Sequence, residues 1–506
     1  MADNKIDMVE PSSELVESIT HDEKSPSTAY VADTTPDSHH KSKAERRLVL
    51  KADCLIVPLA ALIYFVAYLD RNSIGNAKLM GLQEDTNMDN DQYSNCLIMF
   101  FVGYIIFMLP GNILLRFFVP NHQLSVTVAT FGALLCGMSA ARNYQTVLAL
   151  RILIGSAQAF IQGLGLYVSL WYKRDEAATR GATYYSAATF SGAFSGLISY
   201  SIGNNLTLEA TGREPWRWLF IIEGLMAVAV SILIFIFLPR FPDKLRNGRT
   251  WPFTEAEIEL AIERSASYNT VGAKVVPWQI WVTLKDPKSW GFAIINAGVA
   301  LGISSVGSFL PSFIKAFGYT SEHAQLFSII PYACATVALI AVCTTSDRLN
   351  MKGPFIIGCL SVTCIGYTLL LADVNVKAKM VAACMITAGL YPTVVLTVTW
   401  LGINTGGFTK RGTTWAMGEV FGQCFSIMGQ KMYNTPPGYI KGHAIALGFM
   451  VLSMLSALVL IFWMKHLNAK KDRIVAEYAA RGEAHPHINR SLEEEYDFHI
   501  NFRYIL

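Results

Sequence analysis

The sequence predicts an all-α membrane protein with twelve transmembrane helices arranged in two six-helix halves. Of its 506 residues, 52% are hydrophobic and only 16% are charged, and the mean hydropathy is +0.35. A soluble domain usually contains about 25% charged residues. The apolar residues also fall into repeated runs close to the roughly 20 residues that cross a hydrocarbon core about 30 Å thick. The longest polar stretch lies between the sixth and seventh runs and separates the two halves.

The composition and the motifs exclude several other functions. A net charge of +3, without a basic patch interleaved with aromatic residues, argues against nucleic acid as a partner. The nine cysteines lack the CxxC or CxxH spacing of a metal site and are expected to be buried thiols. The sequence contains no Walker motif, zincin helix or GxSxG motif. We therefore expect no enzymatic activity, no catalytic residue, no metal and no cofactor.

Residues 1–51 predict a disordered cytosolic tail. They are rich in Ser, Thr, Asp, Glu and Lys, and they show no apolar period. A basic cluster closes the tail just before the first apolar run, which starts at Ala52. A cleavable signal peptide needs its apolar core close to Met1. The first run is therefore expected to remain in the protein as the first span.

The two halves are predicted over residues 52–239 and 289–465. The six runs of the first half lie near 52–69, 93–115, 123–141, 144–170, 182–203 and 217–239, and those of the second near 289–313, 325–345, 354–372, 379–401, 412–433 and 443–465. In the cytosolic linker, 240–288, Thr254 and Glu257 have the spacing of a capping box, which predicts a short helix. Residues 466–506 are expected to form a cytosolic C-terminal tail.

The distribution of basic residues predicts the orientation. Lys and Arg are more frequent in the loops on the side of the linker than in the loops on the other side. Because short cytoplasmic loops retain positive charge, both termini are expected in the cytosol, and we expect a plasma-membrane location. On the outer side, Asn205 begins a glycosylation sequon so close to the membrane that its use is left open.

The fourth span carries a candidate anion site. Charged residues inside a bilayer are costly and are therefore functional candidates. Arg151 and Gln158 fall on one helical face, and we count no other basic residue in the body of a span. Because a guanidinium grips a carboxylate bidentately, this face is predicted to hold an anion. The alternative is that Arg151 pairs with an acidic neighbour and locks two helices together.

Two carboxylates also stand inside spans, Glu223 in the sixth and Glu419 in the eleventh. An intramembrane carboxyl group that meets water from alternating sides can carry a coupling proton. Glu419 is favoured because Gln423 lies one turn away on the same face, whereas a structural role is the main alternative for Glu223. Asp70 is the next candidate if neither Glu couples the proton.

Further polar and aromatic side chains lie on helical faces that lipid would not favour. Tyr64 lies in the first span, and Tyr391, Trp400 and Asn404 lie in or just after the tenth. We predict that these four residues help to line the substrate pocket. The alternative for each of them is a contact between helices.

Two loops resemble the signature of the major facilitator superfamily, and the resemblance covers roughly residues 50–465. Gly111 and Arg116 match the signature between the second and third spans, and Asp347 and Arg348 match it between the eighth and ninth. The resemblance implies a central site between two halves, which opens alternately to either side of the membrane. It also implies that Arg116, Asp347 and Arg348 belong to a cytoplasmic gate.

Longer stretches are similar to the fungal allantoate permease-like branch of the anion:cation symporter family. These stretches are Tyr68–Asn76, Pro110–Leu115, Trp216–Gly224 and Pro436–His443. Members of that branch carry small organic anions such as ureides, nicotinate, pantothenate and biotin, generally with protons. The stretch Arg151–Gly155 also resembles the fourth span of vesicular glutamate and sialic acid transporters, in which the matching Arg contacts the anion. Those relatives tend to have Glu where this chain has Gln158, which moves attention to Glu223 and Glu419.

Together these features predict a monomeric, proton-coupled importer of a small organic anion in the lipid bilayer. Arg151 would hold the anion, and Glu223 or Glu419 would carry the proton. An exporter of a fungal secondary metabolite is the first alternative, because the same scaffold can support efflux. A nutrient sensor that signals through its tails is the second alternative.

Overall fold

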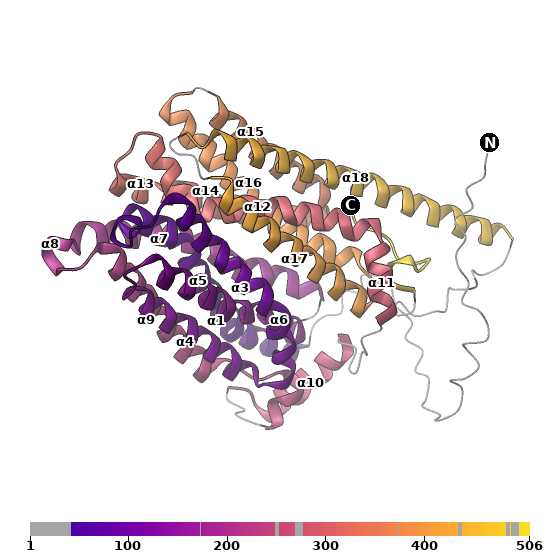
Figure 1. The fold of residues 1–506 in the computed structure, drawn as a ribbon. Coiled ribbons are helices and arrows are strands. Elements are labelled where there is room, and N and C mark those ends of the chain that lie inside the picture. Colours follow the sequence, from indigo (N-terminus) through magenta and orange to yellow (C-terminus); the bar gives the residue numbers. More distant parts are fainter. Residues whose placement is uncertain are drawn as a thin grey trace. The chain divides into compact units, whose positions relative to one another are not determined.

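The computed structural model describes residues 42–172, 174–247, 252–268, 277–372, 374–433, 438–481, 486 and 495–506. Over these residues the chain forms helices joined by short loops, and they contain no strand (Figure 1). Residues 44–506 constitute one compact unit. Most of the expected N-terminal tail, residues 1–41, lies outside the described residues.

Each predicted span of the first half coincides with a helix. The six helical stretches are α1 (Lys43–Leu79), α3 (Asn90–Phe117), α4 (Pro120–Met138), α5 (Tyr144–Ala159) with η2 (Phe160–Gln162) and α6 (Gly163–Trp171), α7 (Arg174–Asn205) and α9 (Pro215–Phe237). The short helices α2 (Leu82–Asp85) and α8 (Leu208–Thr211) lie in loops on the predicted extracellular side.

The second half repeats this pattern. Its helical stretches are α12 (Pro287–Ala316), α13 (Ser321–Phe327) with α14 (Ile329–Leu349), α15 (Gly353–Leu371), α16 (Val376–Asn404), α17 (Phe408–Lys431) and α18 (Ile440–Ala480). Between the halves lie η3 (Pro242–Asn247), α10 (Glu255–Tyr268) and α11 (Pro277–Lys285). A turn, η4 (Tyr496–Phe498), follows α18.

The all-α membrane fold class is confirmed. In the part of the chain that the structure describes, nine helical stretches are long and apolar enough to cross a membrane, and α4, α7 and α17 are not among them. Both α7 and α17 pack across the two halves, α7 against α13 and α14 and α17 against α3. Their polar residues therefore face protein, which explains their low hydropathy. The count of twelve crossings stays a prediction.

Side-chain caps begin four of the spanning helices at their predicted extracellular ends. Asp89 and Gln92 form a capping box at the start of α3, with Gln92 N donating to Asp89 Oδ1 over 2.7 Å. Asn143, Thr320 and Asn375 cap α5, α13 and α16 through the amide three residues later. These side chains satisfy backbone donors that a helix leaves open at its first turn, and they fix where each helix begins.

The first helix begins at Lys43, so the predicted tail boundary at residue 51 is corrected. Its first turns contact the linker helix α10, where Lys51 Nζ lies 2.7 Å from Glu257 Oε2. The capping box of α10 is confirmed, because Thr254 N donates to Glu257 Oε2 over 2.9 Å. Burial raises the pKa of the Glu257 carboxyl, but hydrogen bonds from Lys51 and the Thr254 backbone outweigh this effect and leave the pKa below its usual value.

The linker helix α11 has an unusual distribution of side chains. It buries the polar residues Gln279 and Thr283 and exposes Trp278 and Trp281. It packs against α17 and α12, and only Asp286 separates it from the start of α12. The apolar face of α11 is therefore directed away from the protein.

The two halves contact each other closely on the predicted extracellular side. Gly192 on α7 lies against the ring of Tyr332 on α14, with no space for a side chain. The Tyr332 hydroxyl donates to Asn72 Oδ1 on α1 over 3.2 Å, and Thr336 Oγ1 donates to Thr189 Oγ1 over 2.8 Å. Small residues therefore allow the halves to meet, and polar side chains join them.

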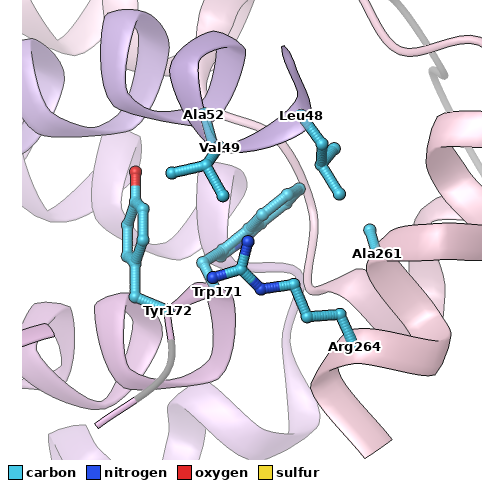
Figure 2. A pocket seen from close by; sticks show the side chains of 7 residues that line it. All are labelled: Leu48, Val49, Ala52, Trp171, Tyr172, Ala261 and Arg264. Carbon is cyan, nitrogen blue, oxygen red and sulfur yellow. The ribbon is translucent and has the colours of Figure 1, made fainter. Parts of the chain in front are cut away.

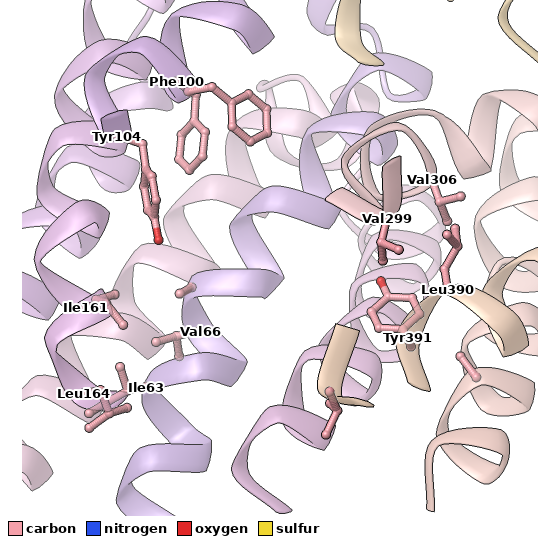
Figure 3. Packing of buried hydrophobic residues seen from close by; sticks show 14 of the residues in the cluster. Ile63, Val66, Phe100, Tyr104, Ile161, Leu164, Val299, Val306, Leu390 and Tyr391 are labelled. Atoms are coloured by element: carbon pink, nitrogen blue, oxygen red, sulfur yellow. The ribbon is translucent and has the colours of Figure 1, made fainter. Parts of the chain in front are cut away.

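Buried apolar side chains fill the interior of each half. Figure 3 shows Ile63, Val66 and Tyr104 in one group, and Val299 and Leu390 in another. All belong to one continuous cluster of buried residues. The polar residues described below are set into this apolar surrounding.

Candidate functional site

Asp70 joins α1 to α5 through a buried ion pair. Arg151 Nη1 donates to Asp70 Oδ1 over 3.1 Å, and Gln158 Nε2 donates to Asp70 Oδ2 over 3.0 Å. Arg151 is 2% exposed, and both Asp70 and Gln158 are fully buried. The structure therefore shows the second of the two sequence-based alternatives for Arg151, which is pairing with an acidic neighbour. Arg151 Nε and Nη2 have no hydrogen-bond partner.

Arg71, the next residue on α1, has a different environment. Its Nε donates to Gln158 Oε1 over 3.1 Å. Its guanidinium carbon lies 5.0 Å from the ring centroid of Tyr68, 5.1 Å from that of Phe100 and 4.9 Å from that of Tyr104. Arg71 is half-buried, and it forms no ion pair with any carboxylate of the described residues. It is thus a half-buried cation that aromatic rings surround, with the carboxylates of Asp70 and Glu419 in electrostatic range but not in direct contact.

Arg71 was not among the residues predicted from the sequence, and the prediction that only Arg151 is basic in the body of a span is wrong. The predicted first span ends at residue 69, just before the charged pair, whereas α1 continues to Leu79. Ile74 and Ala77 are buried in this extension. These apolar residues after the charged pair were the signal in the sequence that the helix continues.

Glu223 on α9 lies against the same turn of α1. Ser73 donates to Glu223 Oε1, and Ser73 Oγ lies 2.7 Å from Ser195 Oγ on α7. Asn76 Nδ2 also donates to Ser195 Oγ, over 2.9 Å. Glu223 is 2% exposed, and its Oε2 has no partner. Among the described residues no ion pair to Glu223 is formed, and an unpaired carboxylate is costly to bury.

Glu419 on α17 connects the two halves. Gln162 Nε2 on η2 donates to Glu419 Oε2 over 3.2 Å, and Trp415 Nε1 donates to Glu419 Oε1 over 3.4 Å. Glu419 is half-buried. The Trp415 ring lies over Gly165 on α6, and its Cη2 atom is 2.9 Å from the position that a Cβ on Gly165 would occupy. The hydrogen bond between Gln162 and Glu419 therefore joins the two halves, and it breaks if they move apart.

The two predicted tyrosines occupy different surroundings. Tyr64 lies one turn before Tyr68, with ring centroids 6.0 Å apart, and it contacts Tyr184 at 5.0 Å. Tyr64 thus belongs to an aromatic group that includes a neighbour of Arg71. Tyr391 is fully buried, its hydroxyl has no partner, and its ring lies 6.2 Å from that of Tyr332.

The structure does not bring Trp400 and Asn404 together with Arg151. Trp400 Nε1 donates to the Ile505 carbonyl over 2.8 Å. Asn404 Nδ2 donates to the same carbonyl over 2.9 Å, and Ile505 N donates to Asn404 Oδ1 over 2.8 Å. Both side chains therefore bind the backbone of the segment that follows α18. Their predicted place in the substrate pocket stays a prediction that these contacts do not support.

The predicted gate residues lie at the ends of helices. Lys352 donates to the exposed Asp347, and Arg348 is exposed in the last turn of α14. The side chain of Arg116, at the end of α3, lies outside the described residues. Their role as a gate stays a prediction.

A small cavity lies where α1 meets α6 and α10 (Figure 2). Leu48, Val49, Trp171 and Ala261 line it together with Arg264, which contacts Glu45 at 3.7 Å. Its volume of about 10 Å³ holds at most one water molecule. The cavity belongs to the joint between α1 and the linker. Within the described ranges, no group of three His, Cys, Asp or Glu side chains is placed to hold a metal ion.

Comparisons with known proteins agree with this arrangement. The chain is 30% identical to the high-affinity nicotinic acid transporter of Saccharomyces cerevisiae over 95% of its own length and 90% of that protein's. It is 32% identical to the MFS transporter prlL of a fungal species, over 85% of this chain and 89% of the relative. The solved D-xylose-proton symporter shares the fold at a TM-score of 0.62 and 15% identity, covering 80% of this chain and 96% of that one. The relatives are membrane transporters, and this chain is likewise a transporter and not an enzyme. Because the family profile described as Major Facilitator Superfamily also matches residues 60–430, the chain belongs to that superfamily.

Proposed function

We propose that the protein imports a small organic anion together with protons, and that the anion is an aromatic monocarboxylate of the nicotinate type. The unpaired guanidinium of Arg71 carries this proposal. It lies inside the protein, where aromatic rings contact it on several sides. A planar guanidinium binds a carboxylate through two parallel hydrogen bonds, and the rings offer flat faces to an aromatic substrate.

The charges around Arg71 support anion binding. Asp70 forms its ion pair with Arg151 and accepts a hydrogen bond from Gln158, so both of its carboxylate oxygens already have partners other than Arg71. Gln158 in turn accepts from Arg71 Nε and fixes the direction of the guanidinium. In this proposal Arg151 is a positioning residue that holds Asp70, Asp70 in turn holds Gln158, and Arg71 contacts the substrate. This assignment differs from the sequence-based one, in which Arg151 held the anion.

The similarity to a nicotinic acid transporter supports the choice of substrate class. Nicotinate combines one carboxylate with a flat pyridine ring. Tyr68, Phe100 and Tyr104 supply rings close to the cation. Trp415, which is 37% exposed, supplies a further ring from the opposite half. Ureides, which lack an aromatic ring, would use the carboxylate contact alone.

For the coupling proton we propose Glu419, with Glu223 as the second candidate and Asp70 as the third. Glu419 contacts Gln162 of the other half, so rocking of the halves would change the exposure of its carboxylate. Glu223 contacts α1 through Ser73, close to the anion site. Asp70 is less suited because it already neutralises Arg151. A monomer in the plasma membrane with both termini in the cytosol completes the proposal.

Uptake of labelled substrates in a host without its own vitamin and ureide permeases tests the anion site. Arg71→Gln removes charge-assisted hydrogen bonds that contribute about 1.5–3 kcal/mol, so the apparent affinity for nicotinate should fall about tenfold to 150-fold. Arg71→Lys should recover only part of this loss, because an ammonium lacks the planar fork. Arg142→Gln, at an exposed arginine, is the matched control.

Unchanged affinity in an Arg71→Gln protein that reaches the membrane normally would refute the anion site. The same cells decide the direction of transport. Import predicts accumulation of label from the medium, whereas an exporter would instead accelerate the loss of label from preloaded cells.

Exchange experiments test the proton site. Glu419→Gln keeps the shape of the side chain but cannot titrate. It should abolish accumulation driven by a pH gradient while leaving exchange of internal for external substrate intact. Glu223→Gln is measured in parallel. If both variants accumulate substrate with an unchanged pH dependence, neither residue couples the proton.

A further inference from the structure

The segment Glu495–Leu506 returns to the helices of the second half after α18. Asp497 in this segment is fully buried, and so are most atoms of Tyr504. The backbone of Ile505 pairs with Asn404 in both directions, and Lys352 N donates to the Leu506 carbonyl over 2.8 Å. The segment is therefore folded against the protein.

Asp497 is the centre of a buried charge cluster. Lys288 on α12 donates to Asp497 Oδ2, and Lys410 on α17 donates to Asp497 Oδ1 over 2.5 Å. Asp286 Oδ2 lies 2.8 Å from the Lys410 ammonium. The Tyr504 hydroxyl donates to Asp497 Oδ2 over 2.9 Å. Two buried lysines thus share two buried carboxylates, and one of these comes from the segment.

A second set of contacts joins the segment to α18. Lys471 Nζ donates to the carbonyl oxygens of Asp497, His499 and Phe502 over 2.7, 3.0 and 2.9 Å. These bonds use all three donors of the ammonium. Asn468 Nδ2 donates to the Tyr504 carbonyl over 2.9 Å, and Tyr504 N donates back to Asn468 Oδ1 over 2.9 Å. Side chains that bind backbone groups in both directions form a site for an extended peptide.

We propose that Glu495–Leu506 is a strap that fastens the predicted cytosolic ends of α12, α16, α17 and α18 into one rigid unit, and that the protein transports only while the strap is docked. Lys288, Lys410, Trp400 and Lys471 supply one contact from each of these helices. In the described residues, the hydrogen bonds and ion pairs of Asp497–Leu506 all go to the second half or remain within the strap.

The strap therefore moves with the second half when the halves rock against each other. Alternating access needs each half to turn as a body around the central site. The short loop that joins α16 to α17, Thr405–Gly407, itself contacts the strap, because Gly406 packs against the backbone of Asp497. When the strap is released, the lysines lose Asp497 and the helix ends separate, and the motion no longer reaches the substrate site.

Hydrogen exchange measured by mass spectrometry on the full-length protein tests docking directly. In the unmodified protein the amides of Tyr504 and Ile505 should exchange at least about 100-fold more slowly than in an unstructured peptide, because they donate to the side chains of Asn468 and Asn404. Rapid exchange in the unmodified protein would overturn the proposal without any variant.

Two variants release the strap in independent ways, and each has a matched control. Asp497→Asn removes the charge that pairs with Lys288 and Lys410, whereas Glu259→Gln removes an exposed charge in the linker, which contacts Arg246 at 2.8 Å and not the strap. Gly406→Ala places a methyl carbon 2.6 Å from Asp497 N and changes no charge, whereas the same change at Gly402 meets nothing within 4 Å.

Both test variants should lose the exchange protection of the strap, and their uptake rate should fall in proportion to the docked fraction, about tenfold when about 10% remains docked. Both controls should keep protection and uptake. The proposal is wrong if a variant with a released strap transports at the normal rate, or if Asp497→Asn and Gly406→Ala leave the strap protected. Exchange is measured without substrate, so this result is independent of the proposed anion and proton sites.

Discussion

The ion pair between Asp70 and Arg151 should hold α1 and α5 together, and a double-mutant cycle can measure this contribution. Both side chains are at most 2% exposed, and Arg151 Nη1 lies 3.1 Å from Asp70 Oδ1. Removing one partner of a buried pair leaves an uncompensated charge and costs about 3–5 kcal/mol. Asp70→Asn also places an amide donor against Arg151 or Gln158, which are donors themselves.

The double variant should be less damaged than the two single variants predict. In Asp70→Asn combined with Arg151→Gln, two neutral amides face each other, and neither position leaves an unpaired charge. We expect a coupling free energy of at least about 2 kcal/mol, which corresponds to a factor of about 30 in an equilibrium or rate constant. Because large membrane proteins often unfold irreversibly, the half-life of the purified protein in detergent at one elevated temperature is the suitable measurement.

An exposed ion pair provides the control for this cycle. Arg246 Nη2 lies 2.8 Å from Glu259 Oε1, and both side chains are more than half exposed. The cycle of Arg246→Gln and Glu259→Gln should give a coupling below about 1 kcal/mol. If the losses at Asp70 and Arg151 simply add, the two residues do not act as a pair, and the positioning role of Arg151 is refuted.

Three further predictions concern the contact between the halves, the topology and the linker. Gly196→Ala places a methyl carbon 2.6 Å from a carbonyl oxygen of α13. It should therefore keep the predicted extracellular side from closing and lower uptake at least about tenfold. Gly181→Ala, which meets nothing within 4 Å, should leave uptake unchanged in the same assay. Epitopes at Met1 and within residues 487–494 should both be inaccessible to antibody in intact cells and accessible after permeabilisation, and labelling of intact cells would show that the orientation is wrong. Because the pKa of Glu257 is lowered, its ionised carboxylate stabilises the contact between α10 and α1 at neutral pH. This stabilisation is lost as the pH falls below the ordinary Glu pKa of about 4 and through the lowered pKa. Amide exchange of α10, corrected for the intrinsic effect of pH, should therefore accelerate on acidification in the unmodified protein but not in Glu257→Gln.

The sequence predicted the helices well because their signals are local. Apolar runs depend on neighbouring residues in the chain, and so does the capping box at Thr254 and Glu257. The close approach at Gly192 depends on the size of a single side chain. The lower hydropathy of α7 and α17, in contrast, follows from their place between the halves and depends on partners that are distant in the sequence.

The candidate site was harder to predict because its partners are distant in the sequence. Arg151 was identified as important, but the distance of 81 positions to Asp70 concealed the pairing that neutralises it. The hydropathy pattern ends the predicted first span before Arg71, because hydropathy counts every charge as unfavourable. It does not register that Asp70 pairs with Arg151 on another helix. Trp400 lies on the expected polar face, but its partner is a carbonyl group 105 residues later.

The exposed tryptophans of α11 have a consequence for the depth at which the protein sits in the bilayer. Tryptophan favours the headgroup layer, so Trp278 and Trp281 are expected to fix α11 at that level, parallel to the membrane plane. The 30 residues of α12 extend about 45 Å, about 15 Å more than the hydrocarbon core. The first turns of α12 therefore have room to lie among the headgroups, and a thinner or thicker bilayer would be accommodated at this end by tilting of α12.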